Sequence, residues 1–403
     1  MSSIKTMSFL DKLLEGLEVE WKPLGEYADY EQPTKYLVKS NNYNDDFSIP
    51  VLTAGKTFIL GYTDETVGIY KASENPVIIF DDFTTANKWV DFDFKAKSSA
   101  MKMITSKDES KALLKYIYYW MNTLPSDLVD GDHKRQWISN YANKLIPIPC
   151  PDNPKKSLEI QQKIVGILDT FSELTAGLTA ELTAELTARK QQYSYYREQL
   201  LRFEEGEVEW KTLGDVILPT SNIRWRDTNK SYRYIDLTSV CREKNTIIET
   251  TEINTNNAPS RAQKLILKND VIFATTRPTQ QRLCLITEEY SGEIASTGYC
   301  ILRADTNHIL PKWIYYWITS SEFKKYVEEN QSGSAYPAIS DTKVKEFKIP
   351  VPSIEEQQRI VSILDKFDVL TTSISEGLPK EIELRQKQYE YYRNQLLSFS
   401  ASR

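Results

Sequence analysis

An internal duplication in this sequence limits the possible folds more than any other pattern in it. Arg189–Phe203 (RKQQYSYYREQLLRF) returns near the C-terminus as Arg385–Phe399 (RQKQYEYYRNQLLSF). Three more pairs follow in the same order: Glu18–Glu26 with Glu207–Asp215, Ile146–Pro149 with Ile349–Pro352, and Gln161–Phe171 with Gln357–Phe367. Such a repeat means that one structural unit occurs twice, so it has to be settled before any other assignment.

The segments between these anchors differ as sharply as the anchors agree. Residues 27–145 and 216–348 are about equal in length but almost unrelated in sequence. A constant frame that holds dissimilar inserts is what a protein needs if it recognises two different targets in the same way. Duplication of a domain with no recognition role is the alternative, but it gives no reason for the inserts to diverge so much further than the frame.

Composition and charge narrow the class of protein. At 403 residues the chain has room for two or three domains with their own cores. No apolar run reaches the roughly 18 residues that span a bilayer, and no signal segment opens the chain, so we expect a cytoplasmic protein without membrane association. The formal net charge of -6 argues against bulk electrostatic coating of nucleic acid, but it allows local basic surfaces.

Two long helices are predicted, one after each insert. In the first, over residues 157–203, Ser157 is the expected N-cap, and apolar residues from Ile160 to Leu178 recur in alternating steps of four and three, as in a coiled coil. Repeated Thr-Ala-Glu-Leu units then place a leucine at every fourth position, which interrupts the heptad. Ser353–Glu356 opens the second helix with a capping box, and Gly377 and Pro379 predict a kink or break in it.

We expect the two helices to pack together. The predicted contact and spacer residues are Leu174, Leu178, Leu182, Leu186, Tyr193 and Tyr196 in the first helix and Ile374, Tyr389 and Tyr392 in the second. If a two-fold axis relates the copies, the helices run antiparallel with one insert at each end. The expected fold is therefore two α/β (α+β) domains separated by two long antiparallel coiled-coil helices, in a pseudo-two-fold, circular arrangement.

The expected domain boundaries follow the repeat. They are residues 1–152 for the first domain with a short N-terminal helix, 153–206 for the central helix, 207–352 for the second domain and 353–403 for the distal helix. Strand-like runs such as Asp270–Ala274 give both inserts the pattern of mixed α/β domains. Each insert also has an aromatic helical stretch, Tyr116–Trp120 or Trp313–Trp317, which we interpret as core.

Basic and polar residues gather in the loops of both inserts. Such side chains read base edges and hold phosphates. The candidate DNA-binding residues are Lys35, Lys39, Asn41, Asn42, Lys95, Lys97, Lys134 and Arg135 in the first insert, and Asn222, Arg224, Arg226, Lys230, Arg233, Thr276, Arg277, Gln280, Gln281, Arg282, Ser334 and Tyr336 in the second. One such cluster alone is more typical of a solvated loop, and the recurrence in both inserts is what favours binding.

The sequence lacks the motifs of catalysis. Thr53–Thr57 resembles the end of a phosphate loop, but Pro50 stands where that loop needs glycine. We find no G-x-G-x-x-G cradle, no amino-methyltransferase motif and no hydrolase triad. The cysteines are scattered and the two histidines, His133 and His308, lie far apart, which predicts no metal site. We therefore expect a non-catalytic chain that binds no cofactor and no metal.

With its QQ(K/R)IVxILD helix starts and YYRxQLL helix ends, the sequence resembles the specificity (S) subunits of type I restriction-modification enzymes. The Thr-Ala-Glu-Leu array is similar to that of the type IC branch, and the resemblance covers essentially the whole chain. It implies that the inserts are target recognition domains, each reading one half of a bipartite, asymmetric site in double-stranded DNA. It also implies that the helices set the unread spacer and bind two modification (M) subunits.

The same resemblance assigns the chemistry to partners. M subunits would use S-adenosylmethionine to methylate adenine, and restriction (R) subunits would use ATP and Mg²⁺ to translocate and cleave DNA. Two other functions stay open on the sequence alone. One is a coiled-coil scaffold or adaptor without DNA readout, and the other is an autonomous methyltransferase, which the missing cofactor loop disfavours.

Overall fold

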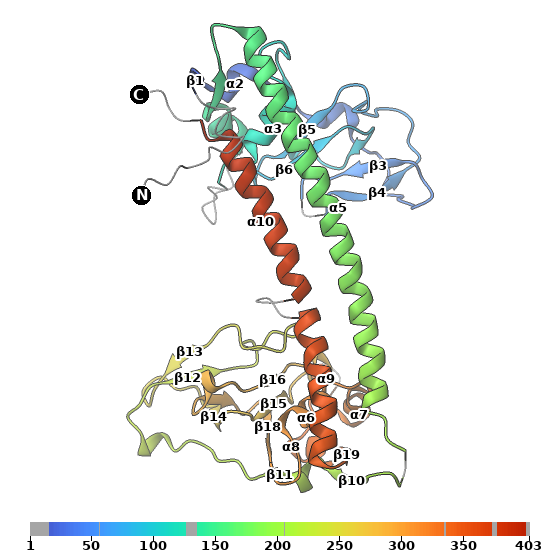
Figure 1. Cartoon of the computed structure of the whole chain (residues 1–403), viewed down its shortest axis with the longest axis vertical. Coiled ribbons are helices and arrows are strands. Elements are labelled where there is room, and N and C mark those ends of the chain that lie inside the picture. The colour runs from blue at the N-terminus through green and yellow to red at the C-terminus, as the bar shows by residue number, and fades with distance from the viewer. Residues whose placement is uncertain are drawn as a thin grey trace, which may run out of the picture. The chain divides into compact units, whose positions relative to one another are not determined.

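The computed structural model describes residues 16–55, 57–125, 135–204, 206–333, 336–372 and 377–399. The chain divides into two compact units, Met1–Ala180 with Glu383–Arg403, and Glu181–Ile382. Each unit contains one insert and a part of the long helices (Figure 1). Because both units are built on the same plan, the order of elements in one can be matched to that in the other.

The first unit is built on a four-stranded antiparallel sheet in the order β2-β8-β5-β6. Its strands are β2 (Ala28–Glu31), β8 (Met101–Ser106), β5 (Val77–Asp81) and β6 (Asn87–Val90). The helix α3 (Leu114–Met121) packs on one face, and a small sheet of β4 (Ile59–Thr63), β3 (Ile49–Leu52) and β7 (Lys95–Ala96) covers the other. Short elements of this unit are α2 (Leu24–Tyr27), η1 (Pro33–Tyr36), α4 (Gln136–Ser139) and η2 (Tyr141–Asn143).

The second unit repeats this plan with the sheet β11-β18-β15-β16. Its strands are β11 (Ile217–Leu218), β18 (Tyr299–Ala304), β15 (Val271–Ala274) and β16 (Leu283–Leu285). The small sheet contains β13 (Thr251–Ile253), β12 (Tyr232–Ile235), β17 (Ile294–Ser296) and β14 (Ala262–Leu265), and the helices are α6 (Pro311–Ile318), α7 (Ser321–Asn330) and α8 (Asp341–Glu346). Short 3-10 turns are η3 (Leu213–Val216), η4 (Trp225–Asp227), η5 (Pro278–Gln280) and η6 (Glu288–Tyr290).

Two of the repeated sequence anchors are hydrogen-bonded to each other. In the first unit β1 (Val19–Pro23) pairs antiparallel with β9 (Leu145–Pro149), so that Trp21 lies opposite Pro147. In the second unit β10 (Glu209–Thr212) pairs with β19 (Lys348–Val351), so that Trp210 lies opposite Pro350. Each insert is therefore closed at its base by a two-stranded ribbon that joins its first and last residues.

A buried glutamine in each copy fastens the insert to the long helix. Gln161 accepts a hydrogen bond from the Leu113 amide and donates to the Lys111 carbonyl. Gln357 likewise accepts from the Leu310 amide (2.9 Å) and donates to the His308 carbonyl (3.1 Å). Both side chains are fully buried. The second glutamine of the QQ(K/R)IVxILD start is exposed in both copies, so the first is the structural one.

The aromatic helices α3 and α6 lie within the inserts, but both contact the long helices in the same way. Lys115 and Tyr119 of α3 both contact Asp169. The second copy repeats the arrangement, with Lys312 and Tyr316 of α6 on Asp365. Burial raises the pKa of the Tyr316 hydroxyl, and its hydrogen bond to the Asp365 carboxylate acts in the same direction, so the hydroxyl remains a donor. The interpretation of these aromatic stretches as core is confirmed.

We expect Gln357→Leu to destabilise the second unit by about 1–3 kcal/mol, because the half-buried Leu310 amide would lose its acceptor. Urea unfolding followed by the fluorescence of Trp313 and Trp317 in the same core measures this. The matched control is Gln358→Leu, one position along the same helix, where the side chain is exposed. Equal destabilisation by both variants would contradict a fastening role for Gln357.

The long helices begin and end close to their predicted limits. The helix α5 (Pro154–Leu200) is continuous over 47 residues. It starts three residues before the predicted Ser157, since Asn153 accepts from the Lys156 amide and proline suits the first helical position. The second helix is interrupted as predicted: α9 (Ile354–Thr372) is followed by α10 (Gly377–Leu397). At Gly377 φ is +77°, and an added Cβ would lie 2.6 Å from the Val369 carbonyl oxygen.

Within each unit the long helices pack antiparallel. In the first unit the Phe171 ring lies 5.6 Å from that of Tyr392, and Ser172 donates to the Tyr389 hydroxyl. In the second unit Tyr193 and Tyr196 stack on Phe367 at 6.0 and 5.8 Å. The predicted fold class of two α/β copies with long helices that pack together is thus confirmed. A pseudo-two-fold, circular relation between the copies stays a prediction.

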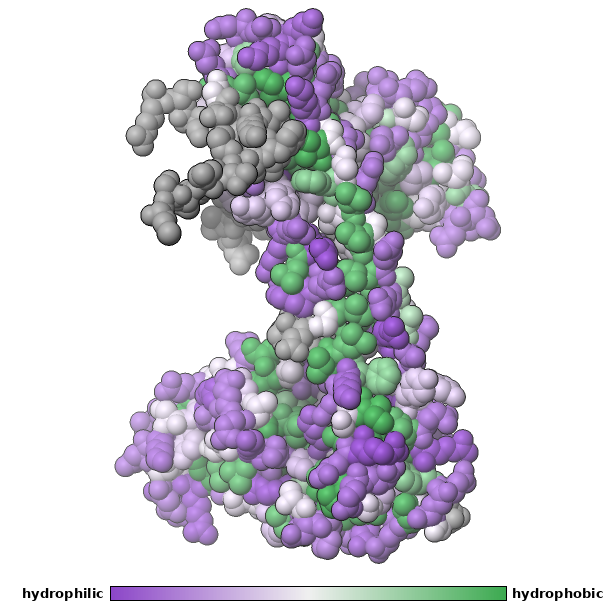
Figure 2. Space-filling model, in the orientation of Figure 1, coloured by the Kyte–Doolittle hydropathy of each residue, from purple (hydrophilic) through white to green (hydrophobic). Residues whose placement is uncertain are grey.

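The packed face of α5 differs from the predicted one at Leu174 and Leu178. These leucines are 58% and 43% exposed, and Figure 2 shows hydrophobic residues along the surface of the long helices. Half-buried residues of this part of α5 are instead spaced in alternating steps of four and three: Thr175, Thr179, Leu182, Leu186, Arg189 and Tyr193. Leucines spaced by four turn by about 40° around the helix at each step, so they cannot all face one partner. Ile374 lies outside the described residues.

Candidate nucleic-acid interface

The predicted basic clusters occupy the same place in both units. In the first unit the segment from Lys35 to Asn42 lies between β2 and β3, and in the second the segment from Asn222 to Lys230 lies between β11 and β12. Each segment thus connects the first strand of the main sheet to the small sheet. Because this place is common to two unrelated inserts, the loop position belongs to the fold and only its residues vary.

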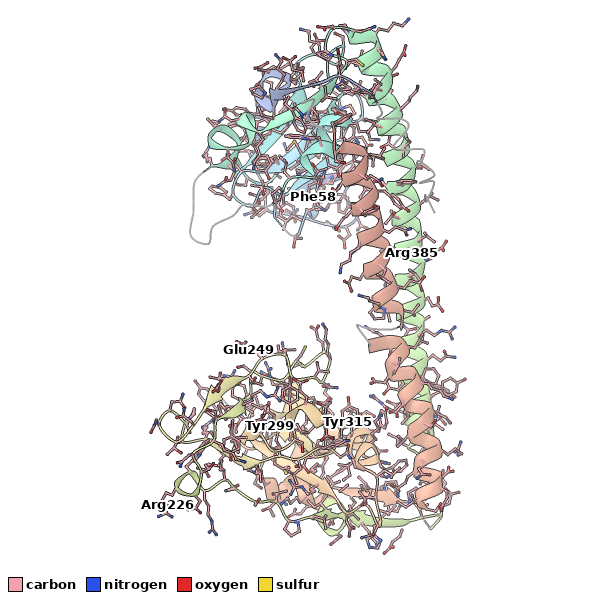
Figure 3. All side chains as sticks on the ribbon, turned by 60° about the vertical axis from the view of Figure 1, so that its left-hand side comes forward. Phe58, Arg226, Glu249, Tyr299, Tyr315 and Arg385 are labelled. Carbon is pink, nitrogen blue, oxygen red and sulfur yellow. The ribbon has the colours of Figure 1, made fainter. Side chains whose placement is uncertain are left out.

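In the second unit, hydrogen bonds fix the backbone of the segment from Asn222 to Lys230, whereas the basic side chains of this segment are exposed. Trp225 donates through Nε1 to the Ala262 carbonyl, and Thr255 donates to the carbonyls of Trp225 and Thr228. The neighbouring Arg224, Arg226 and Lys230 are exposed and have no ion pair within the described part of the chain. Figure 3 shows Arg226 pointing away from the body of this unit, whereas Tyr299 and Tyr315 lie inside it.

The backbone brings one more arginine to this cluster. The Ile223 amide donates to the Gln263 carbonyl, and the Leu265 amide donates to the Ser221 carbonyl. These two bonds pair the segment around Ile223 with the segment around Gln263. The exposed Arg261 therefore lies beside Trp225, whose indole is bonded to Ala262. Sequence reasoning missed Arg261, because it is far from Arg224 along the chain and no local motif marks it.

Arg233 and Asn222 are placed differently from the exposed arginines. Arg233 donates to Glu293, forms an ion pair with Glu289 at 2.9 Å and lies over the Tyr290 ring. It therefore supports the fold, and its guanidinium is not available to a phosphate. Asn222 is exposed, and its backbone bridges to Lys264 on the small sheet.

The second and third polar loops of this unit meet in space. Thr276 forms a β-bridge with Ala338, and the Arg277 amide donates to the Pro337 carbonyl at 2.7 Å. The Arg277 guanidinium lies 5.5 Å from the centre of the Tyr336 ring. Arg277 and Gln281 both have φ near +50°, a conformation that non-glycine residues adopt only when their surroundings enforce it. The loop therefore presents an exposed Arg277 on a fixed backbone.

The other candidate residues in these loops differ in burial and in hydrogen bonding. Arg282 donates to the Val240 carbonyl at 2.7 Å and to Gln280, so it holds the loop in place. The Nε2 of Gln281 is buried without a hydrogen-bond partner among the described atoms. Tyr336 is 73% exposed. Ser334 lies outside the described residues.

In the first unit most of the candidate residues are exposed. Lys35 pairs with Glu31, one turn away, at 2.9 Å, an exposed contact of little strength. Lys97 donates to the Asn41 side chain and lies over the Tyr43 ring. Lys39 and Asn42 are exposed. Lys134 lies outside the described residues, and the exposed Arg135 immediately precedes α4.

The environment of Lys95 corrects the prediction that this residue contacts DNA. Its side chain is 2% exposed, and its ammonium contacts the Val67 carbonyl and the Glu65 carboxylate, so it cannot reach a phosphate. Glu65 in turn accepts from the amides of Lys39 and Ser40. The bond from the Ser40 amide lowers the pKa of the Glu65 carboxyl, and the contact with Lys95 acts in the same direction. Lys95 thus supports the loop that carries Lys39.

The described residues contain no group of three or more His, Cys, Asp or Glu side chains that could hold a metal ion. Among the same residues, no helix combines the length and the hydrophobicity that a membrane span requires. All four cysteines are free thiols. What the site offers is exposed arginine, lysine, asparagine and tyrosine on fixed backbone, which is suited to contacts with phosphates and base edges.

The sequence is similar to known proteins over nearly its whole length. A family model described as the type I restriction modification DNA specificity domain matches residues 17–188 and again 206–384. The EcoR124I/EcoR124II specificity subunit of Escherichia coli is 56% identical, over 98% of this chain and 97% of that protein. The EcoprrI specificity subunit of Escherichia coli is 31% identical over 92% of each chain. The crystal structure of the HsdS subunit from Thermoanaerobacter tengcongensis has 29% identity and a TM-score of 0.40, covering 48% of this chain and 47% of that chain.

Proposed function

Because the chain belongs to the family of type I restriction-modification DNA specificity subunits, we propose that its two inserts read the two unlike halves of one bipartite DNA site. The protein is a non-catalytic subunit that determines DNA recognition, and in this family the cofactors are used by the M and R subunits that assemble with it on DNA. In this proposal residues 1–152 and 207–352 are the target recognition domains, and 153–206 and 353–403 are the helical segments.

The observation that carries the proposal is the matched position of the exposed loops in the two units. Both main sheets have the same strand order, and in both the basic loop connects the first strand to the small sheet. The residues in these loops differ almost completely between the copies. The same scaffold with different contact residues gives two recognition domains. Each domain has the same orientation relative to its own helix, but the two domains differ in specificity, as an asymmetric DNA site requires.

The loops of the second unit divide into two kinds of contact. Arg224, Arg226 and Lys230 extend from a loop edge without a fixed side-chain geometry, which suits phosphate oxygens. Arg277 is held by its backbone bond to Pro337 and by the Tyr336 ring, so its guanidinium is oriented before DNA binds. A fixed guanidinium fits the O6 and N7 acceptors of guanine in the major groove.

The long helices set the distance between the half-sites and bind the M subunits in this proposal. A continuous α5 supports it, because a helix of fixed rise per residue transmits a fixed spacing. We place the complex in the cytoplasm, where its DNA substrate and a reducing environment for four free thiols would both be found. A scaffold without DNA readout is disfavoured by the family to which the chain belongs.

The net charge of -6 leads to a testable prediction about shared binding. We expect the isolated chain to bind duplex DNA weakly, and the complex with M subunits to bind more tightly with a steeper loss of affinity as salt rises. The steeper slope would come from additional phosphate contacts on the M subunits, each contributing about 0.9 to the slope of log K against log salt. Titrations at several salt concentrations measure both values. Equal affinity and equal slope for chain and complex would overturn the shared contribution.

A further inference from the structure

The turn between β5 and β6 in the first unit corresponds to the Arg277 loop of the second. In both main sheets the turn follows the third strand in the order, β5 in β2-β8-β5-β6 and β15 in β11-β18-β15-β16. The register matches residue by residue. Ala28 and Ile217, which are equivalent in the sequence repeat, lie opposite Ser106 and Ala304. When the strand pairing is followed to the next strand of each sheet, Phe80 is the counterpart of Phe273, and Asp82 is the counterpart of Thr275.

A hydrogen bond outside the sheet gives the same correspondence. The Gln136 amide donates to the Asp82 carbonyl at 2.8 Å, and the Ile339 amide donates to the Thr275 carbonyl at 2.9 Å. Gln136 and Ile339 are equidistant from the repeated Ile146 and Ile349, ten residues further along in both cases. Two independent alignments therefore agree, and they make Phe83 and Thr84 the counterparts of Thr276 and Arg277.

The base of the β5–β6 turn is held by buried charges. Asp82 is 1% exposed and accepts a hydrogen bond from the Trp137 amide at 2.9 Å. The ammonium of Lys102, also 1% exposed, lies 3.6 Å from the Asp82 carboxylate and over the Tyr30 ring. Loss of one member of such a pair leaves the other charge buried and unpaired, so the pair fixes the place where the turn leaves the sheet.

The tip of the turn is exposed and apolar. Asp81 accepts from the amides of Phe83 and Thr84, and Thr85 has a φ of +61°. Phe83 is 40% exposed and Thr84 is exposed. The turn thus presents a phenyl ring and a threonine side chain on a fixed backbone, in the place where the second unit presents Arg277.

We propose that Phe83 and Thr84 contact the bases of the half-site read by the first insert, and that Phe83 recognises the C5-methyl group of a thymine. The proposal rests on the proposed function, since it assumes that the first insert reads DNA. A phenyl ring and a threonine methyl are the side-chain groups that pack on thymine methyls in the major groove, whereas arginine reads guanine. The two copies thus use one loop position for different bases, which makes the site asymmetric.

The test uses the complex of the full chain with M subunits and a duplex that carries its methylation site. Each thymine of the first half-site is replaced in turn by deoxyuridine, which removes only the methyl group. We expect one replacement to weaken binding roughly tenfold for the wild-type complex. With Phe83→Ala, the unmodified duplex should bind roughly tenfold more weakly, and that replacement should have no further effect. Phe83→Leu, which keeps an apolar contact, should retain most of the affinity and most of the sensitivity.

Phe92→Ala is the matched control, because Phe92 is a comparably exposed phenylalanine (37%) of the same unit. It should leave both the affinity and the sensitivity to deoxyuridine unchanged. Wild-type affinity for Phe83→Ala, or deoxyuridine sensitivity that persists in this variant, would overturn the proposal. Failure of the proposed function is distinguishable, since the wild-type complex would then not discriminate its site from a duplex with a scrambled first half-site.

Discussion

Arg277→Ala is expected to abolish recognition of one base pair in the half-site read by the second insert, with the other half-site unaffected. A bidentate contact to guanine contributes about 1–3 kcal/mol of discrimination, so affinity for the cognate duplex should fall roughly ten- to hundredfold. The reason for so large an effect at one residue is the fixed geometry: the Arg277 backbone is bonded to Pro337 and its guanidinium lies on Tyr336. Binding of the complex with M subunits to duplexes with single base-pair changes measures it.

Two further variants separate a base contact from a phosphate contact at this position. Arg277→Lys keeps the charge but loses the planar fork, so a base contact predicts a loss close to that of alanine. Lys268→Ala removes an equal charge at the opposite end of β15, where Lys268 pairs with Glu288, and should change little. If Arg277→Ala weakened binding to every duplex by the same factor, Arg277 would contact a phosphate and the assignment would be wrong.

Insertion of one further Thr-Ala-Glu-Leu unit after Leu186 is expected to lengthen the unread spacer by one base pair and to leave both half-sites unchanged. Four residues extend a helix by about 6 Å and turn its far end by about 40°, whereas one base pair advances about 3.4 Å and about 35°. The rotation decides the outcome, because a recognition domain on the wrong side of the duplex cannot bind. The difference in length matters less, since a small tilt of the helix compensates for a few ångströms. On the original spacer affinity should fall roughly a hundredfold or more, since one half-site is lost.

The measurement is a series of duplexes with constant half-sites and spacers of increasing length, bound or methylated by the complex. A three-residue insertion at the same position is the control, because it turns the helix by about 300° and matches neither one nor two base pairs. It should weaken binding for every spacer in the series. Altered half-sites with a constant spacer would exclude α5 as the element that sets the spacing.

The candidate site was only partly predictable from the sequence. Composition identified the Arg277 and Tyr336 loops separately, but nothing local shows that the Arg277 amide meets the Pro337 carbonyl. Composition also placed Lys95 among the DNA contacts, although its ammonium is buried against Glu65. A basic residue looks the same in the sequence whether it supports a loop or extends from it. Burial and partners decide between these roles, and both come from residues distant along the chain.

Sequence patterns were enough to reveal the duplication, the two long helices, the break at Gly377 and the absence of catalytic motifs. These features are local or repeated: helix periodicity, capping and glycine conformations act within a few residues, and a repeat is visible without any contact. The three-dimensional structure was needed to show which loops match between the copies, that the packed face of α5 runs through Thr175 and Thr179, and that Gln161 and Gln357 fasten the inserts. Those facts depend on strand register and on hydrogen bonds between distant residues, which no local pattern encodes.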